Sequence, residues 1–147
     1  MFKMSVVSVP TRVVSEDLDR NVAYFLSDIG YIPRLRPDTD YQTISRASYF
    51  RLFKECFILN PERYWSAEEL MTYLGISRTT LYRHLNKLKG MDILEETQEG
   101  KTKKYRIRSG NLMRAWNWVE INLKMAIENY RRTVERIYEL ASSSRTP

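Results

Sequence analysis

The residues best placed to make several directional hydrogen bonds lie in one short stretch, which reads SRTTLYRHLNKLK from Ser77 to Lys89. On a helix turning by about 100° per residue, Thr79, Tyr82, Arg83 and Asn86 point to one side, opposite a stripe of leucines. Arg can bond guanine through two donors, Asn can pair with adenine, and hydroxyl groups reach phosphates. The stretch therefore predicts a helical face suited to a nucleic-acid groove, with Arg78 and Lys87 at its edges.

The positive charge of the chain is concentrated around this stretch. The 147 residues carry a net charge of +6, and residues 78–108 alone hold nine basic and four acidic side chains. A local excess of this kind is typical of a surface that meets phosphates, whereas a diffuse excess indicates only solubility. A solvated polar face is the alternative interpretation, but residues 78–89 contain no acidic side chain, and ordinary solvated faces mix the two signs.

Other kinds of site find little support in the sequence. The single cysteine, Cys56, and the single histidine, His84, cannot form an internal disulfide or a Cys/His zinc cage. Glycine-rich phosphate loops and local nucleophile motifs are lacking. We therefore expect neither metal, cofactor nor catalysis. For Cys56 and His84 we favour packing roles over reactivity and base contact.

Two helices and a hairpin are expected to position the polar face. Ser66 and Glu69 form a capping box that opens a short helix ending at Gly75, and Ser77 caps a second helix over residues 78–89. Leu81, Leu85 and Leu88 anchor that second helix. Beyond Gly90, the runs ILEET and KKYRIR flank a turn at residues 98–101 and predict a β-hairpin.

The segment GISRTTLYRHLNKLKGMDILEE, with KKYRIR after it, resembles the winged helix-turn-helix of bacterial and archaeal transcription regulators in the ArsR, MarR and PadR group. The resemblance implies a recognition helix at 78–89 in the major groove and a wing at 98–104 on the adjacent backbone. The residues it assigns to double-stranded DNA are Arg78, Thr79, Tyr82, Arg83, Asn86, Lys87, Lys101, Lys103 and Lys104. The hairpin is acidic at Glu95, Glu96 and Glu99, and the metal-sensing cysteines of some relatives are lacking.

Two helical patterns precede the capping box. The first has Ser15 as its expected N-cap and apolar residues up to Ile29, and a loop with two prolines follows it. The second is expected to begin near Thr43 or Ser45 and to run as one helix to just before Pro61. Residues 1–14 give no clear pattern.

The C-terminal segment predicts a long helix that Asn111 caps. It lacks glycine and proline as far as Ala141, and at 1.5 Å per residue its roughly 30 residues would span about 45 Å. A compact domain cannot cover such a helix alone, so we expect a homodimer, while packing against the first helix of the same chain remains the alternative. The expected dimerisation residues are Leu112, Trp116, Val119, Leu123, Ala126, Tyr130 and Ile137.

Aromatic residues of the two terminal helices raise the question of a small-molecule effector. Trp116, Trp118, Tyr24, Phe25 and Tyr130 could line a pocket for it, although such residues more often belong to the core.

Together these patterns predict a mainly α protein with a small β-hairpin wing. We expect an N-terminal helix and loop extension at 1–42, a winged helix-turn-helix DNA-binding domain at 43–108, and a dimerisation helix with a frayed tail at 109–147. The function we infer is that of a homodimeric transcriptional regulator, and the alternative is a winged-helix module that docks other proteins. No apolar run approaches the length of a membrane span or a secretory signal, so we expect a cytoplasmic protein without membrane contact.

Overall fold

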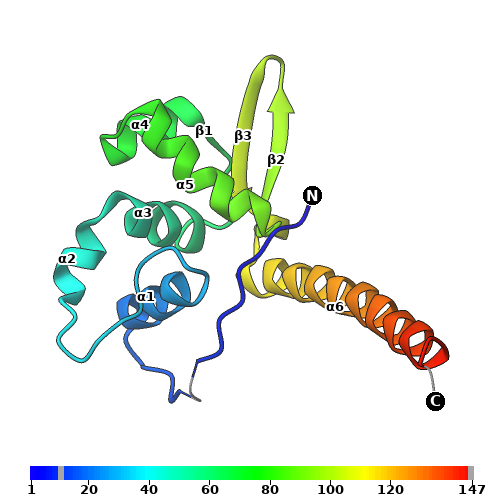
Figure 1. The fold of residues 1–147 in the computed structure, drawn as a ribbon. Helices are drawn as coiled ribbons and strands as arrows, with labels where there is room; N and C mark the ends of the chain where they lie inside the picture. The colour runs from blue at the N-terminus through cyan, green and yellow to red at the C-terminus, as the bar shows by residue number, and fades with distance from the viewer. Residues whose placement is uncertain (10–11, 146–147) are drawn as a thin grey trace.

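The computed structural model describes residues 1–9 and 12–145. Six α-helices, one π-helical segment and a small sheet follow one another in the described chain, and the long helix α6 (Leu112–Ser143) leaves the body of the molecule at an angle (Figure 1). The N-terminus lies beside the base of the hairpin, and the chain leads from there toward α1 (Leu18–Asp28) (Figure 1). Of the expected frayed tail, Thr146 and Pro147 lie outside the described residues.

Helix α1 begins later than the sequence predicts. Its N-cap is Asp17, whose side chain accepts a hydrogen bond from the backbone N–H of Asp19. Ser15 was the expected cap, but its hydroxyl accepts a bond from the backbone N–H of Asp17 instead, which orders the turn before the helix. The helix buries Val22, Ala23 and Leu26 against the rest of the core.

The expected continuous second helix is wrong, because the chain bends twice there. Helix α2 (Tyr41–Arg46) and helix α3 (Ser48–Arg51) are separated at Ala47, which has extended backbone angles of φ −67° and ψ 146°. The following segment, η1 (Leu52–Ile58), is a π-helix whose wider turn ends with Leu59 N–H donating to the carbonyl of Lys54 at 2.9 Å. Phe53, Cys56 and Phe57 are buried in it, as expected.

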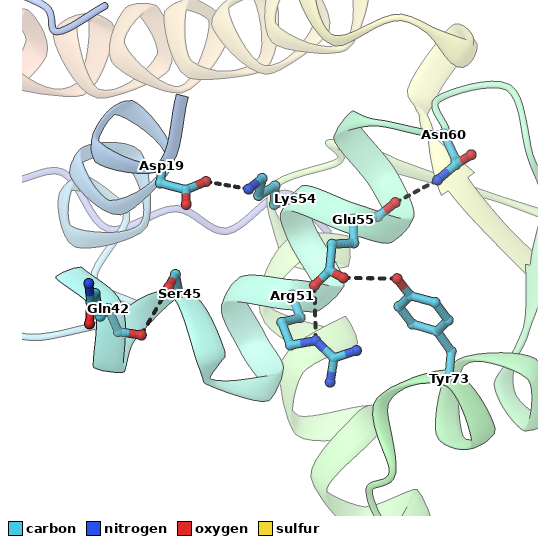
Figure 2. Close-up of polar contacts among 8 residues, drawn as sticks. All are labelled: Asp19, Gln42, Ser45, Arg51, Lys54, Glu55, Asn60 and Tyr73. Carbon is cyan, nitrogen blue, oxygen red and sulfur yellow. Dashed lines mark hydrogen bonds and ion pairs between the residues drawn. The ribbon is translucent and has the colours of Figure 1, made fainter. Parts of the chain in front are cut away.

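Polar contacts tie this π-helix to its neighbours (Figure 2). Glu55 accepts hydrogen bonds from Arg51 and from the hydroxyl of Tyr73, each at 2.9 Å. Lys54 forms an ion pair with Asp19 of α1. The segment thus connects α1 on one side with α4 (Ala67–Leu74), the helix that carries Tyr73, on the other.

The capping box before α4 is confirmed. The hydroxyl of Ser66 accepts from the backbone N–H of Glu69 at 3.1 Å, and the Glu69 carboxylate accepts from Ser66 N–H at 3.0 Å. Gly75 ends the helix in the left-handed conformation, with φ 67°, which a side chain would disfavour. Ser77 then caps α5 (Arg78–Gly90), as the sequence predicts.

The sheet has three antiparallel strands in the order β1–β3–β2. The strands are β1 (Trp65–Ser66), β2 (Leu94–Glu99) and β3 (Thr102–Ile107), and the hairpin turn is shorter than expected because β2 continues through Glu99. Leu94 pairs with Ile107, and Trp65 pairs with Tyr105. The inward side chains of the hairpin are buried in the core, as its alternation predicts.

One hydrophobic core joins the N-terminal helices, the two central helices, the hairpin and the first turns of α6. The leucines expected on the buried side of α5, Leu81, Leu85 and Leu88, all lie in it. The domain boundary expected at residue 42 falls inside α2. The N-terminal extension and the central part therefore have one helix in common, and their buried side chains belong to one hydrophobic core. Among the described residues, no helix is long and apolar enough to cross a membrane.

Candidate nucleic-acid interface

Helices α4 and α5 meet across the turn at Gly75 and Ile76. The backbone N–H groups of both turn residues donate to the carbonyl of Met71, at 2.8 and 3.3 Å, which fixes the path of the chain between the helices. The hydroxyl of Ser77 then accepts from the backbone N–H of Thr80 at 3.2 Å and starts α5. The direction of α5 is therefore set by local hydrogen bonds and by the leucines beneath it.

Three of the four side chains expected on the outer face of α5 are exposed there. Thr79, Arg83 and Asn86 are open to solvent. Tyr82 differs from the expectation of an outward side chain, because its ring is half-buried and packs against the core. An arginine and an amide that stand one turn apart on an exposed helix can bond two neighbouring bases from the same side.

The two residues expected at the edges of this face have partners within the protein. Arg78 donates to a carboxylate oxygen of Glu68 on α4 at 2.5 Å, and this contact lowers the pKa of Glu68. Lys87 donates to the backbone carbonyl of Gly30 at 2.5 Å, and Gly30 begins the loop that follows α1. Each would have to give up its present partner in order to bind a phosphate.

Some basic residues of the hairpin are also paired within the protein, and others are not. Lys104 pairs with Glu99 at 3.0 Å, and Arg106 pairs with Glu95 at 2.5 Å. Lys101 and Lys103 lie at the exposed end of the hairpin, and within residues 1–9 and 12–145 neither has a carboxylate within 4.0 Å. The acidic strand β2 thus neutralises the lower part of the hairpin and leaves its tip positive.

Arg108 holds the base of the hairpin rather than facing solvent. Its guanidinium donates to the carbonyls of Asp92 at 2.7 Å and Leu94 at 3.2 Å. Lys89, at the end of α5, pairs with Glu96. Of the nine basic side chains between residues 78 and 108, Arg83, Lys101 and Lys103 remain without an ion pair or hydrogen-bond partner in the described chain.

His84 has a packing role, as expected from the sequence. It is buried on the inner side of α5, and its Nε2 lies 3.1 Å from the hydroxyl of Ser48. Burial, and secondarily the charge of Arg83, lower the pKa of His84, so the neutral ring is favoured in the folded chain.

Sequence reasoning missed how firmly the N-terminal region holds α5. The hydroxyl of Tyr31 donates to the carbonyl of His84 at 2.6 Å, and the backbone N–H of Lys3 donates to the carbonyl of Gly90 at 2.6 Å. These contacts join residues far apart in the chain, so no local sequence pattern predicts them. The nearest signal in the sequence is the aromatic residue Tyr31, in the loop that follows α1.

The expected dimerisation residues separate into two groups along α6. Val119 is buried within the same chain, and Trp116 meets Phe25 of α1 edge to face at 5.9 Å, so the first turns of α6 pack as the alternative predicted. Leu123 and Ala126 are half-exposed, and Leu112 is exposed. Tyr130 and Ile137, further along, are 70% and 60% exposed.

Beyond Ala126, every described side chain of α6 is exposed, and many of them are large and apolar. Ile127 and Val134 lie beside the expected stripe and widen it, and Ile127 was not among the expected dimerisation residues. Figure 1 shows this part of the helix standing clear of the other elements. An apolar stripe on an unsupported helix is unfavourable in water unless another surface covers it.

The sequence from Arg51 to Gly100 matches the family described as HTH domain. The match starts at the end of α3, includes α4, the turn and α5, and ends at the hairpin turn. Residues 51–100 are thus similar to helix-turn-helix domains. Helices α4 and α5, together with the hairpin of β2 and β3, form a winged helix-turn-helix fold, which confirms the fold class predicted from the sequence.

Several solved structures are similar to the chain. A possible transcriptional regulator from Methanosarcina mazei is 20% identical over 65% of this chain and 85% of its own, with a TM-score of 0.41. An ArsR-like transcriptional regulator from a Rhodococcus species is 24% identical over 73% of this chain and 100% of its own, with a TM-score of 0.36.

A third structure is the homodimeric winged helix-turn-helix DNA-binding domain of a possible ArsR-family regulator from Mycobacterium bovis. It is 20% identical over 65% of this chain and 95% of its own, with a TM-score of 0.35. A comparison with curated protein sequences gave no match.

Proposed function

We propose that this protein is a sequence-specific regulator of transcription that binds double-stranded DNA. The observation that carries the proposal is the exposed face of α5, where Arg83 and Asn86 stand outward within a helix-turn-helix domain. Their donors and acceptors match the base edges of the major groove, which an α-helix can enter. The protein would act by occupying its operator and would carry no chemistry of its own.

In this proposal the side chains have three different roles. Arg83 and Asn86 read bases. Thr79 contacts the backbone or base edges beside them, and Tyr82, whose ring is half-buried, contributes only through its exposed edge. Lys101 and Lys103, at the tip of the wing 98–104, bind phosphates directly because their charges have no partner in the described chain. Arg78, Lys87 and Lys104 contribute only by exchanging Glu68, the Gly30 carbonyl and Glu99 for phosphate oxygens.

We further propose that the regulator is a homodimer joined through α6. The helix has 32 residues, and its outer half carries an apolar stripe that the described chain leaves uncovered, at Tyr130, Val134 and Ile137. Two-fold pairing would present two α5 helices to DNA, and half-sites one turn apart are separated by about 34 Å. The operator would then be pseudo-palindromic. On this division, residues 43–108 bind DNA, 1–42 support them and 109–147 join the copies.

One observation also favours the second candidate, a winged-helix module that docks another protein. The apolar part of α6 beyond Ala126 could bind a different chain as well as a second copy. The unpaired basic side chains at α5 and at the hairpin tip favour DNA, because a protein-docking surface has no need of them.

Selection of bound duplexes from a random pool tests the proposal directly. The full chain is expected to enrich a symmetric motif, and Arg83→Ala is expected to relax one position of each half-site by about 1–3 kcal/mol. Arg114→Ala, which removes an exposed arginine at the start of α6, serves as the matched control. Failure to bind any duplex at low salt, in a folded dimer, would refute the proposal.

A further inference from the structure

A strongly apolar cavity lies away from the proposed DNA surface, between the N-terminal segment, α1 and the start of α6. Its volume is about 470 Å³. Sites for small molecules in proteins usually measure about 300–1,000 Å³ and are lined mostly by apolar side chains. Its floor reaches the core, because Val22, Ile29 and Phe53, which line it, are almost completely buried.

An aromatic wall forms one side of this cavity. The rings of Phe25 and Phe53 stack with their centroids 5.4 Å apart, and Trp116 meets Phe25 edge to face at 5.9 Å. Two of the aromatic residues named from the sequence, Phe25 and Trp116, therefore lie here, whereas Tyr24, Trp118 and Tyr130 do not line it. Such a wall favours a flat apolar molecule.

Two polar side chains of the cavity, Asp28 and Asn21, already have partners. Asp28 accepts two hydrogen bonds from Arg12, at 2.7 and 2.9 Å. The side-chain amide of Asn21 bonds the backbone of Ser15 through both its oxygen and its nitrogen, at 3.1 and 2.7 Å. The cavity thus presents no unpaired charge from these residues, and a charged ligand would lose its hydration without compensation.

The rim of the cavity is apolar and open to water. Val6, Val7 and Met113 line it and are largely exposed, so a bound molecule would cover apolar surface that the chain leaves wet. A helix from a second copy, lying across this rim, is the competing occupant, and the test below separates it from a small molecule.

The segments that line the cavity also hold α5. Met4 lines the cavity, and its neighbour Lys3 is hydrogen-bonded to Gly90 at the end of α5. Ile29 lines it as well, and the next two residues bind α5: Gly30 through Lys87, and Tyr31 through the His84 carbonyl. A molecule that shifts these segments therefore shifts restraints on the helix.

We propose that this cavity binds a neutral aromatic small molecule, and that its occupancy changes the affinity of α5 for DNA through the N-terminal segment and the end of α1. The site itself depends only on the cavity, whereas the regulatory part rests on the DNA-binding function proposed above. The ligand acts by its different affinity for two arrangements of these segments.

The test uses N-phenyl-1-naphthylamine, a neutral aromatic amine whose fluorescence rises in apolar surroundings, with the full chain and no DNA. We expect one site per chain. Val7→Trp, which places an indole at the rim, should weaken binding at least tenfold. Val14→Trp is the matched control, because Val14 lies outside the cavity and is exposed to a similar extent, 74% against 64% for Val7.

Saturating probe is also expected to change the affinity for a labelled duplex at least threefold in the native chain, and to leave the Val7→Trp protein unaffected. Equal probe binding by the two tryptophan variants would overturn the site. Binding seen only after Ile137→Asp separates the copies would assign the cavity to a second copy. Probe binding with unchanged DNA affinity would overturn the coupling alone.

The outcomes separate this inference from the proposed function. Loss of probe binding with intact DNA binding refutes the site and leaves the regulator standing, while DNA failure with intact probe binding does the reverse. If Val7→Trp does not fold, as judged by circular dichroism, Ser5→Trp blocks the same rim from another exposed position.

Discussion

Neutralising the two lysines at the tip of the hairpin tests the assignment of the wing most sharply. Lys101 and Lys103 are exposed and have no carboxylate partner in the described chain, so each is available to one phosphate. Lys101→Gln with Lys103→Gln removes both charges and preserves side-chain length and polarity. Lys124→Gln is the control, because Lys124 is also exposed but lies on α6, 4.0 Å from Glu120.

The expected size follows from counterion release. Each neutralised phosphate contributes about −0.9 to the slope of log affinity against log salt, so two lysines give about 1.8 per chain and about 3.6 per homodimer. Over a fourfold rise in salt, for example from about 50 to 200 mM, that slope corresponds to about a hundredfold. The double variant should therefore lose much of its salt dependence and bind all sequences more weakly.

Fluorescence anisotropy with a labelled random-sequence duplex measures this slope, since phosphate contacts do not depend on sequence. Titrations at several concentrations of KCl give the native, double-variant and control values under the same conditions. An unchanged slope in the double variant, or an equal loss in Lys124→Gln, would show that the hairpin tip does not bind the backbone.

Three further predictions concern α5 and its support. Glu68→Gln frees Arg78 for a phosphate and should steepen the salt slope by about 0.9 per chain, whereas Glu128→Gln on α6 should leave it unchanged; a shallower slope after Glu68→Gln would contradict the reasoning. Leu85→Ala, at a fully buried position, should lower the free energy of unfolding in urea by about 2–5 kcal/mol, and a loss below about 1 kcal/mol would show that α5 is not anchored there. Because burial lowers the pKa of His84, the unfolded chain binds its proton more readily, so unfolding free energy should fall as pH drops from about 6.5 toward 5; His84→Gln should flatten that profile, and an unaltered profile would rule out this histidine as its source.

Local signals predicted the central part of the chain well. The capping box at Ser66 and Glu69, the left-handed Gly75 and the Ser77 cap each depend on side chains within a few residues of the backbone groups they satisfy. The same holds for the leucine stripe of α5 and the alternation in β3. The winged helix-turn-helix fold was therefore predictable.

The errors occurred where local alternatives compete. Both Ser15 and Asp17 can cap a helix, and the Asn21 side chain, which bonds the Ser15 backbone, decides in favour of Asp17. The break at Ala47 and the π-helix after it leave no mark on the apolar spacing, because Phe53, Cys56 and Phe57 are buried in either kind of helix. Residues distant in the chain contact this segment, as the Lys54–Asp19 ion pair and the Tyr73–Glu55 hydrogen bond show.

The linear order of side chains by itself determined the excess of positive charge, the helical face that carries Arg83 and Asn86, and the stripe on the last helix. Only the tertiary structure decided which charges are available, because Glu68, Gly30 and Glu99 reach Arg78, Lys87 and Lys104 from elsewhere in the fold. It also placed Val119 inside the chain and Tyr130 outside it, and it enclosed the cavity beside α1. The physical reason is that charge and periodicity are properties of neighbours in sequence, whereas ion pairing, burial and enclosed volume depend on which distant segments meet.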